Sequence, residues 1–371
     1  MRKDLKFLIA AGGTGGHVMP AATVANEIKE LCPEADFLFI GVGRPAEKDI
    51  LDPLGFKRKD LNVVPLAGRS PIKAIIGLFK LFRSLIGAVS IIREYRPDIC
   101  LAFGGYVCGP VGLASKIFGL PLVLHEQNSK VGLANRWLGY LADLVMLGFR
   151  EAEDGFKKSK RVVFVGNPIR KEISSLAESE RVIDNVSPLL LVIGGSQGSR
   201  RLNQAVMEMA ENIVRKKITF RIIHQTGSEM EKEVATFYQQ IGLKAEVKAF
   251  ISDMAEAYKS ADLAVTRAGA LTLAELLAAK LPAVLVPLPT AAGDHQTMNA
   301  QAVSNLGLAR MVQESEISQG GLERTVFELL EQPGRLQQMS DSAVNKAHDS
   351  GKVGPTMAKL VLEVLENFQK F

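Results

Sequence analysis

Short apolar runs alternate with longer mixed segments along the whole chain. The runs are nearly continuous in valine, isoleucine and leucine, which is typical of strands buried on both faces of a parallel sheet. They predict strands at 6–11, 37–42, 99–103, 122–126, 144–147 and 161–165, and again at 189–193, 219–225, 246–250, 263–266, 283–287 and 309–312. Helical patterns lie between them, for example at 20–31, 202–216 and 271–279. This alternation predicts doubly wound α/β sheets.

The pattern of strands stops and restarts near the middle of the chain. After "VGNPIRKEI" at 165–173 comes a polar stretch, 174–188, without a convincing core strand. We therefore predict two tandem parallel-sheet domains, 1–167 and 168–349, facing a cleft. A C-terminal helix at about 350–371 could pack back on the first domain. Ligands of such folds bind at the carboxyl ends of the strands.

Composition narrows the class of protein. The chain has 371 residues, of which 47% are hydrophobic and 23% charged, so it can bury two sizeable cores. Its net charge of +5 suits nucleic acid, an anionic membrane or a phosphorylated substrate. No basic tract interleaved with aromatic residues occurs, which argues against nucleic acid.

Neither cysteine usage nor targeting segments suggest export. Cys32, Cys100 and Cys108 are odd in number and form no CxxC pair, so neither a disulfide framework nor a zinc site is indicated. No apolar window is long enough for a signal peptide or a membrane-spanning helix. We expect the protein to stay inside the cell.

Two glycine-rich turns each follow the first strand of a predicted domain. They read "GGTGGH" at 12–17 and "GGSQGS" at 194–199. Such turns expose backbone N–H groups beside the positive end of a helix dipole, which suits phosphate. Neither matches G-x-G-x-x-G or a P-loop, and Asp36 lies at the wrong end of the second strand to bind a ribose. An NAD-dependent oxidoreductase is therefore disfavoured.

Further polar residues cluster at predicted strand exits. Glu275, one turn into the helix that follows "TRAGA", could accept two hydrogen bonds from a ribose diol. The loop 291–300 carries Gln296, an amide suited to sugar hydroxyls. His17 and His125 stand at strand exits of the first domain, where an imidazole could act as a base.

Seven motifs taken in order resemble one family. They are "GGTGGHVMPA", "GGYVCGP", "HEQN", "GNPIR", "GGSQGSR", "TRAGALTLAE" and "DHQTMNA", and together they span roughly residues 7–300. The series resembles the UDP-N-acetylglucosamine–lipid I N-acetylglucosaminyltransferases of bacterial peptidoglycan synthesis. The resemblance implies two Rossmann-like domains in the GT-B arrangement. It also implies inverting transfer of N-acetylglucosamine from UDP to the C4 hydroxyl of the muramyl sugar of lipid I, giving lipid II.

The resemblance also assigns the site residues, motif by motif. Thr14, Gly15 and Gly16 would face the donor sugar and diphosphate, and Asn128 and Gln296 would hold sugar hydroxyls. Arg170 and Ser196 would contact the nucleotide, Ile251 would present backbone to uracil, and Glu275 would bind the ribose. The backbone of Ala270, Leu271, Thr272, Leu273 and Ala274 would supply hydrogen-bond donors. His17 is the expected base, with His125 and Glu126 as competitors, and Gly104, Gly105 and Tyr106 belong to the acceptor side.

No cofactor is expected, and no Asp-x-Asp motif occurs to hold a metal ion. A membrane-bound acceptor implies a surface that faces the cytoplasmic side of the membrane, and the stretch 68–98 is the candidate. Its apolar residues recur at spacings of three and four, and 61–97 carries six basic residues against one acid. An apolar helix face edged with lysine and arginine suits anionic lipid headgroups.

Three alternatives stay open. A UDP-N-acetylglucosamine 2-epimerase would share the nucleotide site without needing a membrane patch. A diacylglycerol glycosyltransferase would keep the patch but differ in the sugar contacts around Gln296. A non-catalytic scaffold that binds the nucleotide sugar would not need the polar residues at His17, Glu275 and Gln296.

Overall fold

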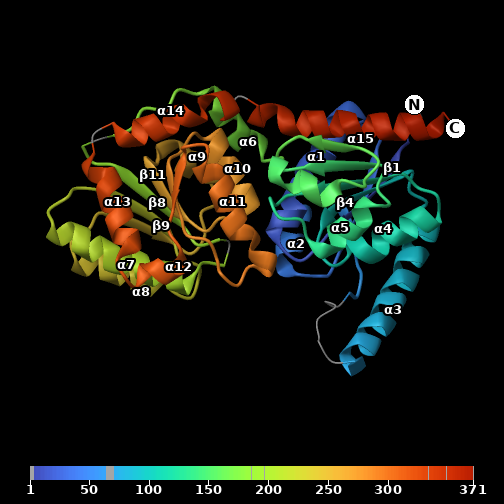
Figure 1. The fold of residues 1–371 in the computed structure, drawn as a ribbon, viewed down its shortest axis with the longest axis horizontal. Helices are drawn as coiled ribbons and strands as arrows, with labels where there is room; N and C mark the ends of the chain where they lie inside the picture. The colour runs from blue at the N-terminus through green and yellow to red at the C-terminus, as the bar shows by residue number, and fades with distance from the viewer. Residues whose placement is uncertain are drawn as a thin grey trace. The chain divides into compact units, whose positions relative to one another are not determined.

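The chain forms two α/β units, each built around one parallel sheet (Figure 1). A computed structural model describes residues 4–63, 71–184, 186–195, 197–332, 334–347 and 349–370, with the backbone alone at 71–80 and at 292. Unit 1 comprises Met1–Ile169 and Lys352–Phe371, and unit 2 comprises Arg170–Gly351. The prediction of two doubly wound parallel-sheet domains is confirmed.

Unit 1 holds a seven-stranded sheet in the order β3-β2-β1-β4-β5-β6-β7. Its strands are β1 (Lys6–Ala11), β2 (Asp36–Gly41), β3 (Lys57–Asp60), β4 (Ile99–Gly104), β5 (Leu122–Glu126), β6 (Leu144–Leu147) and β7 (Val162–Phe164). Its helices are α1 (Gly15–Leu31), α2 (Pro45–Leu51), α3 (Pro71–Tyr95), α4 (Cys108–Ile117), α5 (Leu133–Gly139), the 3₁₀ turn η1 (Arg150–Phe156) and α15 (Val353–Gln369).

Both faces of the central strands of this sheet are buried, which explains why these strands are apolar at successive positions. Phe7 and Ile9 of β1 belong to a core shared with α1 and α15, including Met357. Leu8 and Ala10 point to the opposite face and pack in a second core with α3, α4 and α5. Alternate side chains of a strand face opposite sides, so each needs an apolar partner here.

Two elements of unit 1 differ from the sequence-based expectation. The pattern predicts no strand at Lys57–Asp60, yet β3 forms there as the edge of the sheet, where charged side chains remain solvated. Helix α1 begins at Gly15 rather than at 20 and contains Pro20 in its interior. Gly15, Gly16 and His17 therefore form the first turn of the helix.

Unit 2 holds a six-stranded sheet in the order β10-β9-β8-β11-β12-β13. Its strands are β8 (Leu189–Ile193), β9 (Arg221–Gln225), β10 (Ala245–Lys248), β11 (Leu263–Thr266), β12 (Ala283–Leu285) and β13 (Ala309–Met311). Its helices are α6 (Lys171–Ser174), α7 (Arg200–Arg215), α8 (Glu231–Gln240), α9 (Met254–Ser260), α10 (Ala270–Ala278), α11 (His295–Ser304), α12 (Glu314–Ile317), α13 (Gly321–Glu331) and α14 (Arg335–Ala347), with 3₁₀ turns η2 (Ser175–Glu178), η3 (Ala292–Asp294) and η4 (Ser350–Lys352).

The strand orders define where a ligand can bind. In unit 1 the order reverses between β1 and β4, and in unit 2 between β8 and β11. The loops that leave two such strands run to opposite faces of the sheet, which opens a crevice at their carboxyl ends. The two glycine-rich turns leave β1 and β8, so each lies at the switch point of its own unit.

Candidate functional site

A buried carboxylate organises the first glycine-rich turn. Glu47 of α2 is almost fully buried beneath this turn. Its Oε1 accepts from the N–H of Gly13 at 2.7 Å, and its Oε2 accepts from the N–H of Gly43 at 2.9 Å. The N–H of Val42 also donates to it. Because a Cβ at Gly41 would lie 2.3 Å from Oε2, only glycine fits there. Glu47 thus ties the turn after β1 to the turn after β2.

The imidazole of His17 contacts the backbone at the end of β4. Its Nδ1 lies 3.1 Å from the carbonyl oxygen of Phe103, a contact that a proton on Nδ1 makes a hydrogen bond. That tautomer places the lone pair of the imidazole on Nε2. Gly104, with φ of +113°, and Gly105, with φ of +84°, follow Phe103. A Cβ at Gly104 would lie 2.5 Å from Nδ1 of His17, so the imidazole packs directly on this glycine.

His125, a competing base, is buried with both ring nitrogens engaged. Its Nε2 lies 3.3 Å from the carbonyl oxygen of Gly166, and its Nδ1 lies 3.2 Å from Nε2 of Gln127. Burial lowers the pKa of this imidazole to about 4. His125 therefore stays neutral near pH 7 and serves the packing of β5.

Glu126 is the other alternative to His17 as the base, and both of its carboxylate oxygens accept hydrogen bonds from the loop that follows it. Its Oε1 accepts from the backbone N–H and the side-chain amide of Asn128, at 3.0 and 3.2 Å. Its Oε2 accepts from the N–H of Gly132 and the amide of Asn135, at 3.2 and 2.8 Å. The carboxylate is buried and sets the position of Asn128.

Of the predicted acceptor-side residues, Tyr106 is exposed while Gly104 and Gly105 form the turn itself. Cys108 follows them at the start of α4. Its sulfur accepts from the N–H of Gly104 at 3.0 Å, and burial raises the pKa of the thiol. The thiol is fully buried and also donates to backbone carbonyls of Ala10 and Gly104.

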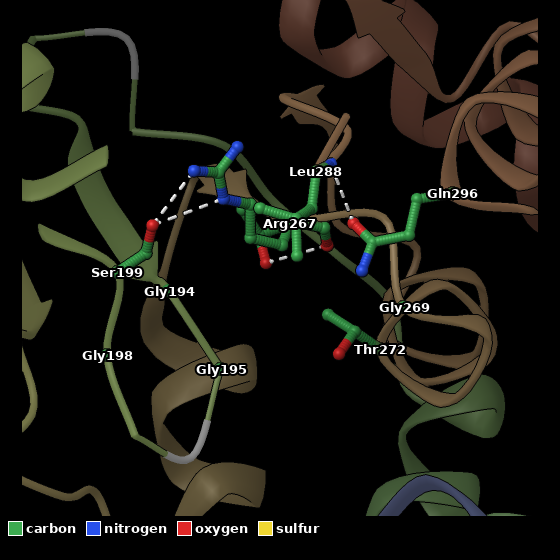
Figure 2. A pocket seen from close by; sticks show the side chains of 10 residues that line it. Gly194, Gly195, Gly198, Ser199, Arg267, Gly269, Thr272, Leu288 and Gln296 are labelled. Carbon is green, nitrogen blue, oxygen red and sulfur yellow. Dashed lines mark hydrogen bonds between the residues drawn. The ribbon is translucent and has the colours of Figure 1, made fainter. Parts of the chain in front are cut away.

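The second glycine-rich turn borders a pocket in unit 2 (Figure 2). The pocket has a volume of about 230 Å³. It is lined by residues from the carboxyl ends of β8, β11 and β12 and from the starts of α10 and α11, namely Gly194, Gly195, Gly198, Ser199, Thr266, Arg267, Gly269, Thr272, Leu288 and Gln296. It lies at the topological switch point of its sheet.

Arg267 is a buried cation in the wall of this pocket. Its Nη2 and Nε donate to the hydroxyl of Ser199, at 2.9 and 3.3 Å (Figure 2). Its Nη1 donates to the carbonyl of Val286 at 3.2 Å and pairs with Glu314 at 2.6 Å. Because a buried charge is costly without partners, these contacts fix the guanidinium, which in turn fixes the end of the glycine-rich turn.

Gln296 and the first turn of α10 form the opposite wall. Oε1 of Gln296 accepts from the N–H groups of Leu288 and Ala268, at 2.9 and 3.2 Å. This orientation turns its amide nitrogen toward Thr272 (Figure 2). Helix α10 begins at Ala270, so its first N–H groups have no acceptor within the helix and lie at the positive end of its dipole.

Glu275 lies one turn further along α10, and its side chain is only 13% exposed. Tyr258 donates its hydroxyl to Oε2 at 2.9 Å, and Nη2 of Arg170 lies 3.6 Å from Oε1. Burial raises the pKa of Glu275, while Arg170 acts in the opposite direction. The structure thus brings Arg170 and Glu275 together. Of their predicted neighbours, Leu271, Leu273 and Ala274 lie on the same helix, and Ser196 lies outside the described residues.

Ile251 is buried, and its backbone N–H donates to Oε1 of Gln225 at 2.9 Å. The backbone N–H of Ile251 is therefore already used within the fold. Sequence reasoning missed Gln225, and it also missed Glu47. Gln225 ends a predicted strand, which was a usable signal. Glu47 reads as a solvated helix charge and gave none.

Two features are absent from the described part of the chain. There, no helix is long and apolar enough to cross a bilayer. Nor do three or more histidine, cysteine, aspartate or glutamate side chains gather in these residues as a metal site would require.

Comparison with known proteins identifies the family. The model of the glycosyltransferase family 28 N-terminal domain matches residues 7–147, and that of the C-terminal domain matches 189–353. A protein of Syntrophus aciditrophicus is 38% identical over 342 residues, covering 92% of this chain and 94% of its own length. One of Methylococcus capsulatus is 38% identical over 364 residues, covering 96% and 98%. Both are named UDP-N-acetylglucosamine--N-acetylmuramyl-(pentapeptide) pyrophosphoryl-undecaprenol N-acetylglucosamine transferase.

Solved structures also resemble this chain. The crystal structure of Acinetobacter baumannii MurG is 27% identical, covers 97% of this chain and 99% of its own, and superposes with a TM-score of 0.76. A UDP-N-acetylglucosamine 2-epimerase superposes with a TM-score of 0.66 at 17% identity, covering 99% and 98%, which is a likeness of fold alone. The resemblance drawn from the seven motifs is confirmed: the chain belongs to glycosyltransferase family 28 and, within it, to the family of N-acetylglucosamine transferases that these relatives represent.

Proposed function

We propose that this protein transfers N-acetylglucosamine from UDP-N-acetylglucosamine to the C4 hydroxyl of the muramyl sugar of lipid I, with inversion and without a metal ion, forming lipid II. The pocket of unit 2 carries this proposal. Its glycine-rich turn is fixed by buried Arg267, and it faces the start of α10. Backbone N–H groups, a helix dipole and a nearby guanidinium suit the diphosphate of UDP and the charge that develops on it as it departs.

The remaining donor contacts are assigned from the family resemblance. We assign the ribose to Glu275, whose partners Arg170 and Tyr258 hold its carboxylate in place. Uracil is assigned to the backbone of Ile251 and the sugar hydroxyls to Gln296 and Asn128. Thr14, Gly15 and Gly16, at the start of α1, face the donor sugar and diphosphate in this proposal.

His17 is the proposed general base. His125 is buried with both nitrogens bonded, and Glu126 accepts four hydrogen bonds within its loop. His17 is only half-buried, and the contact of Nδ1 with Phe103 favours the tautomer that has its lone pair on Nε2. In a single displacement Nε2 would take the proton of the C4 hydroxyl. Replacing His17 with alanine should lower kcat by about 10²–10⁴-fold and leave UDP affinity unchanged.

Peripheral contact with the cytoplasmic face of the membrane is assigned to the stretch 68–98. Residues 68–70 and the side chains of 71–80 lie outside the described part of it. On the described part of α3, Phe82 and Ile86 are 60% and 55% exposed. Helix α3 packs on α4, where Ile117 is exposed in turn, and Arg93 lies over the ring of Phe118 at 5.8 Å. An exposed apolar surface edged with cations fits anionic lipid.

Membrane binding is tested by sedimentation with vesicles of anionic and of zwitterionic lipid. The double variant Phe82→Glu, Ile86→Glu should lose binding to anionic vesicles. Val344→Glu, at an exposed apolar position of unit 2, is the control and should bind as the wild type does. Equal binding by all three proteins would refute the assignment of the surface.

The decisive experiment is turnover. The protein is incubated with UDP-N-acetylglucosamine and a short-chain lipid I analogue in the presence of a chelator, and products are analysed by mass spectrometry. The proposal requires an acceptor heavier by one N-acetylhexosamine and release of UDP. Release of UDP with free N-acetylmannosamine would indicate an epimerase, and donor binding without any product would indicate a scaffold.

A further inference from the structure

Gln225 joins two parts of unit 2 that the proposed function assigns to different halves of the donor. It ends β9 and is 3% exposed. Its Nε2 donates to the carbonyl of Gly195 at 2.9 Å, and its Oε1 accepts from the N–H of Ile251 at 2.9 Å. Gly195 lines the pocket, whereas Gln225 does not. One side-chain amide therefore bridges the glycine-rich turn and the segment that carries Ile251.

The backbone around this amide is closely packed, so the bridge has little freedom. A Cβ at Gly198 would lie 2.0 Å from the carbonyl oxygen of Thr226, and one at Gly227 would lie 2.3 Å from that of Gln197. The N–H of Gly227 donates to the carbonyl of Ala249 at 3.1 Å. The end of β9 is thus in direct backbone contact with the glycine-rich turn on one side and with the exit of β10 on the other.

We propose that Gln225 is a positioning residue that couples the diphosphate and uracil halves of the donor site. The inference rests on the proposed function, which places diphosphate at the glycine-rich turn and uracil at Ile251. The coupling needs one donor and one acceptor on the same short side chain, because a carbonyl lies on one side and an N–H on the other. Glutamate of the same length supplies only the acceptor, and methionine supplies neither.

Two variants separate the two bonds. Gln225→Met removes both, and Gln225→Glu keeps the acceptor for Ile251 while losing the donor for Gly195. Affinities for uridine and for UDP are measured by calorimetry, because uridine reports only the base and ribose half. A neutral hydrogen bond that holds a binding group in place is worth about fivefold in affinity.

The expected pattern is specific. Gln225→Met should bind uridine about fivefold and UDP about 25-fold more weakly, since UDP depends on both bonds. Gln225→Glu should bind uridine within about twofold of wild type but UDP at least about fivefold more weakly. In turnover, KM for the donor should rise in both variants while kcat stays near the wild-type value. Gln301→Met, on the exposed face of α11, is the matched control and should change none of these quantities.

Three results would overturn the coupling. Unchanged uridine affinity in Gln225→Met would show that the bond to Ile251 does not hold the base site. An equal loss for uridine and UDP in the same variant would show that the bond to Gly195 contributes nothing. A fall in kcat at unchanged KM would place Gln225 outside donor binding. Failure of the wild-type protein to bind UDP at all would instead refute the proposed function, and it is seen before any variant is made.

Discussion

Replacing Gly104 with alanine should disable the proposed base without touching the nucleotide pocket. Gly104 has φ of +113°, and its missing side chain leaves room for the imidazole of His17. A Cβ built there lies 2.5 Å from Nδ1 and 2.7 Å from Cε1. The methyl group and the ring cannot both keep their present positions.

The size of the effect follows from these distances. An ordinary contact requires the ring to retreat by about 0.9 Å, which separates Nδ1 from the Phe103 carbonyl that orients it. A misplacement of about 1 Å in a reacting group costs about 100-fold in rate. The positive φ adds about 1–3 kcal/mol of backbone strain to the folded state. We therefore expect kcat to fall about 100-fold and the free energy of unfolding to fall by a few kcal/mol.

The assay compares steady-state kinetics, UDP affinity and urea unfolding for Gly104→Ala and Gly109→Ala. Gly109 lies in α4 with ordinary backbone angles, and a Cβ there meets nothing within 4 Å, so alanine should leave activity intact. UDP affinity should be the same in both variants because neither glycine is among the residues assigned to the donor. A Gly104→Ala enzyme with wild-type kcat would refute the role given to the imidazole, and a loss of UDP affinity would show that the substitution also disturbs the first glycine-rich turn.

The remaining predictions concern stability and the first glycine-rich turn. Burial lowers the pKa of His224 to about 3 and that of His125 to about 4. As pH falls below about 6.5, these imidazoles take up protons only in the unfolded chain, so their contribution to the free energy of unfolding should shrink by up to about 2.7 kcal/mol per pH unit down to about pH 4. Denaturant unfolding between pH 7 and 4.5 measures this, and a flat profile would contradict it. Arg181 donates to three backbone carbonyls at the ends of α9 and α10, so Arg181→Met should cost about 3 kcal/mol in urea unfolding, whereas Arg161→Met, at an exposed ion pair, should cost under about 1 kcal/mol. Equal costs would argue against the role of these buried bonds. Glu47→Gln places an amide donor against backbone N–H groups; it should destabilise the fold by about 2 kcal/mol and, because it loosens the turn proposed to face the donor, lower both kcat and UDP affinity. Wild-type stability and UDP affinity in this variant would contradict the role given to the carboxylate.

Strands that carry apolar residues were predictable, and a strand of charged residues alone was not. All the predicted strands exist: the central strands have unbroken apolar runs because they are buried in a core, while the edge strand β10 was found although it is mostly exposed. The strand Lys57–Asp60 was missed because it consists of charged residues, one of which pairs with Asp36 of β2, and these carry no apolar periodicity. The pattern of apolar residues along the sequence indicates which strands are buried, and the side chains of β3 are exposed or only partly buried.

The residues of the candidate site likewise fall into those that the sequence reveals and those that it does not. The glycine-rich turns, His17, Glu275 and Gln296 could be found from the sequence, because chemistry at a strand exit needs particular residue types in a particular order. The supporting residues Glu47 and Gln225 could not be assigned, since each acts on backbone groups of segments distant in the chain. Nothing in the local sequence distinguishes Glu47 from a solvated side chain, and the place of Gln225 at a strand end does not reveal its partners.

The sequence by itself therefore determined two parallel α/β units, the switch points where their turns lie, and the family. These follow from periodicity, glycine placement and motif order, which are local properties of the chain. Only the tertiary structure decided which hydrogen-bond partners His17, His125 and Glu126 have, and which carboxylate and amide hold the two glycine-rich turns. Those answers depend on burial and on partners brought together by the sheet, and neither exists until the chain has folded.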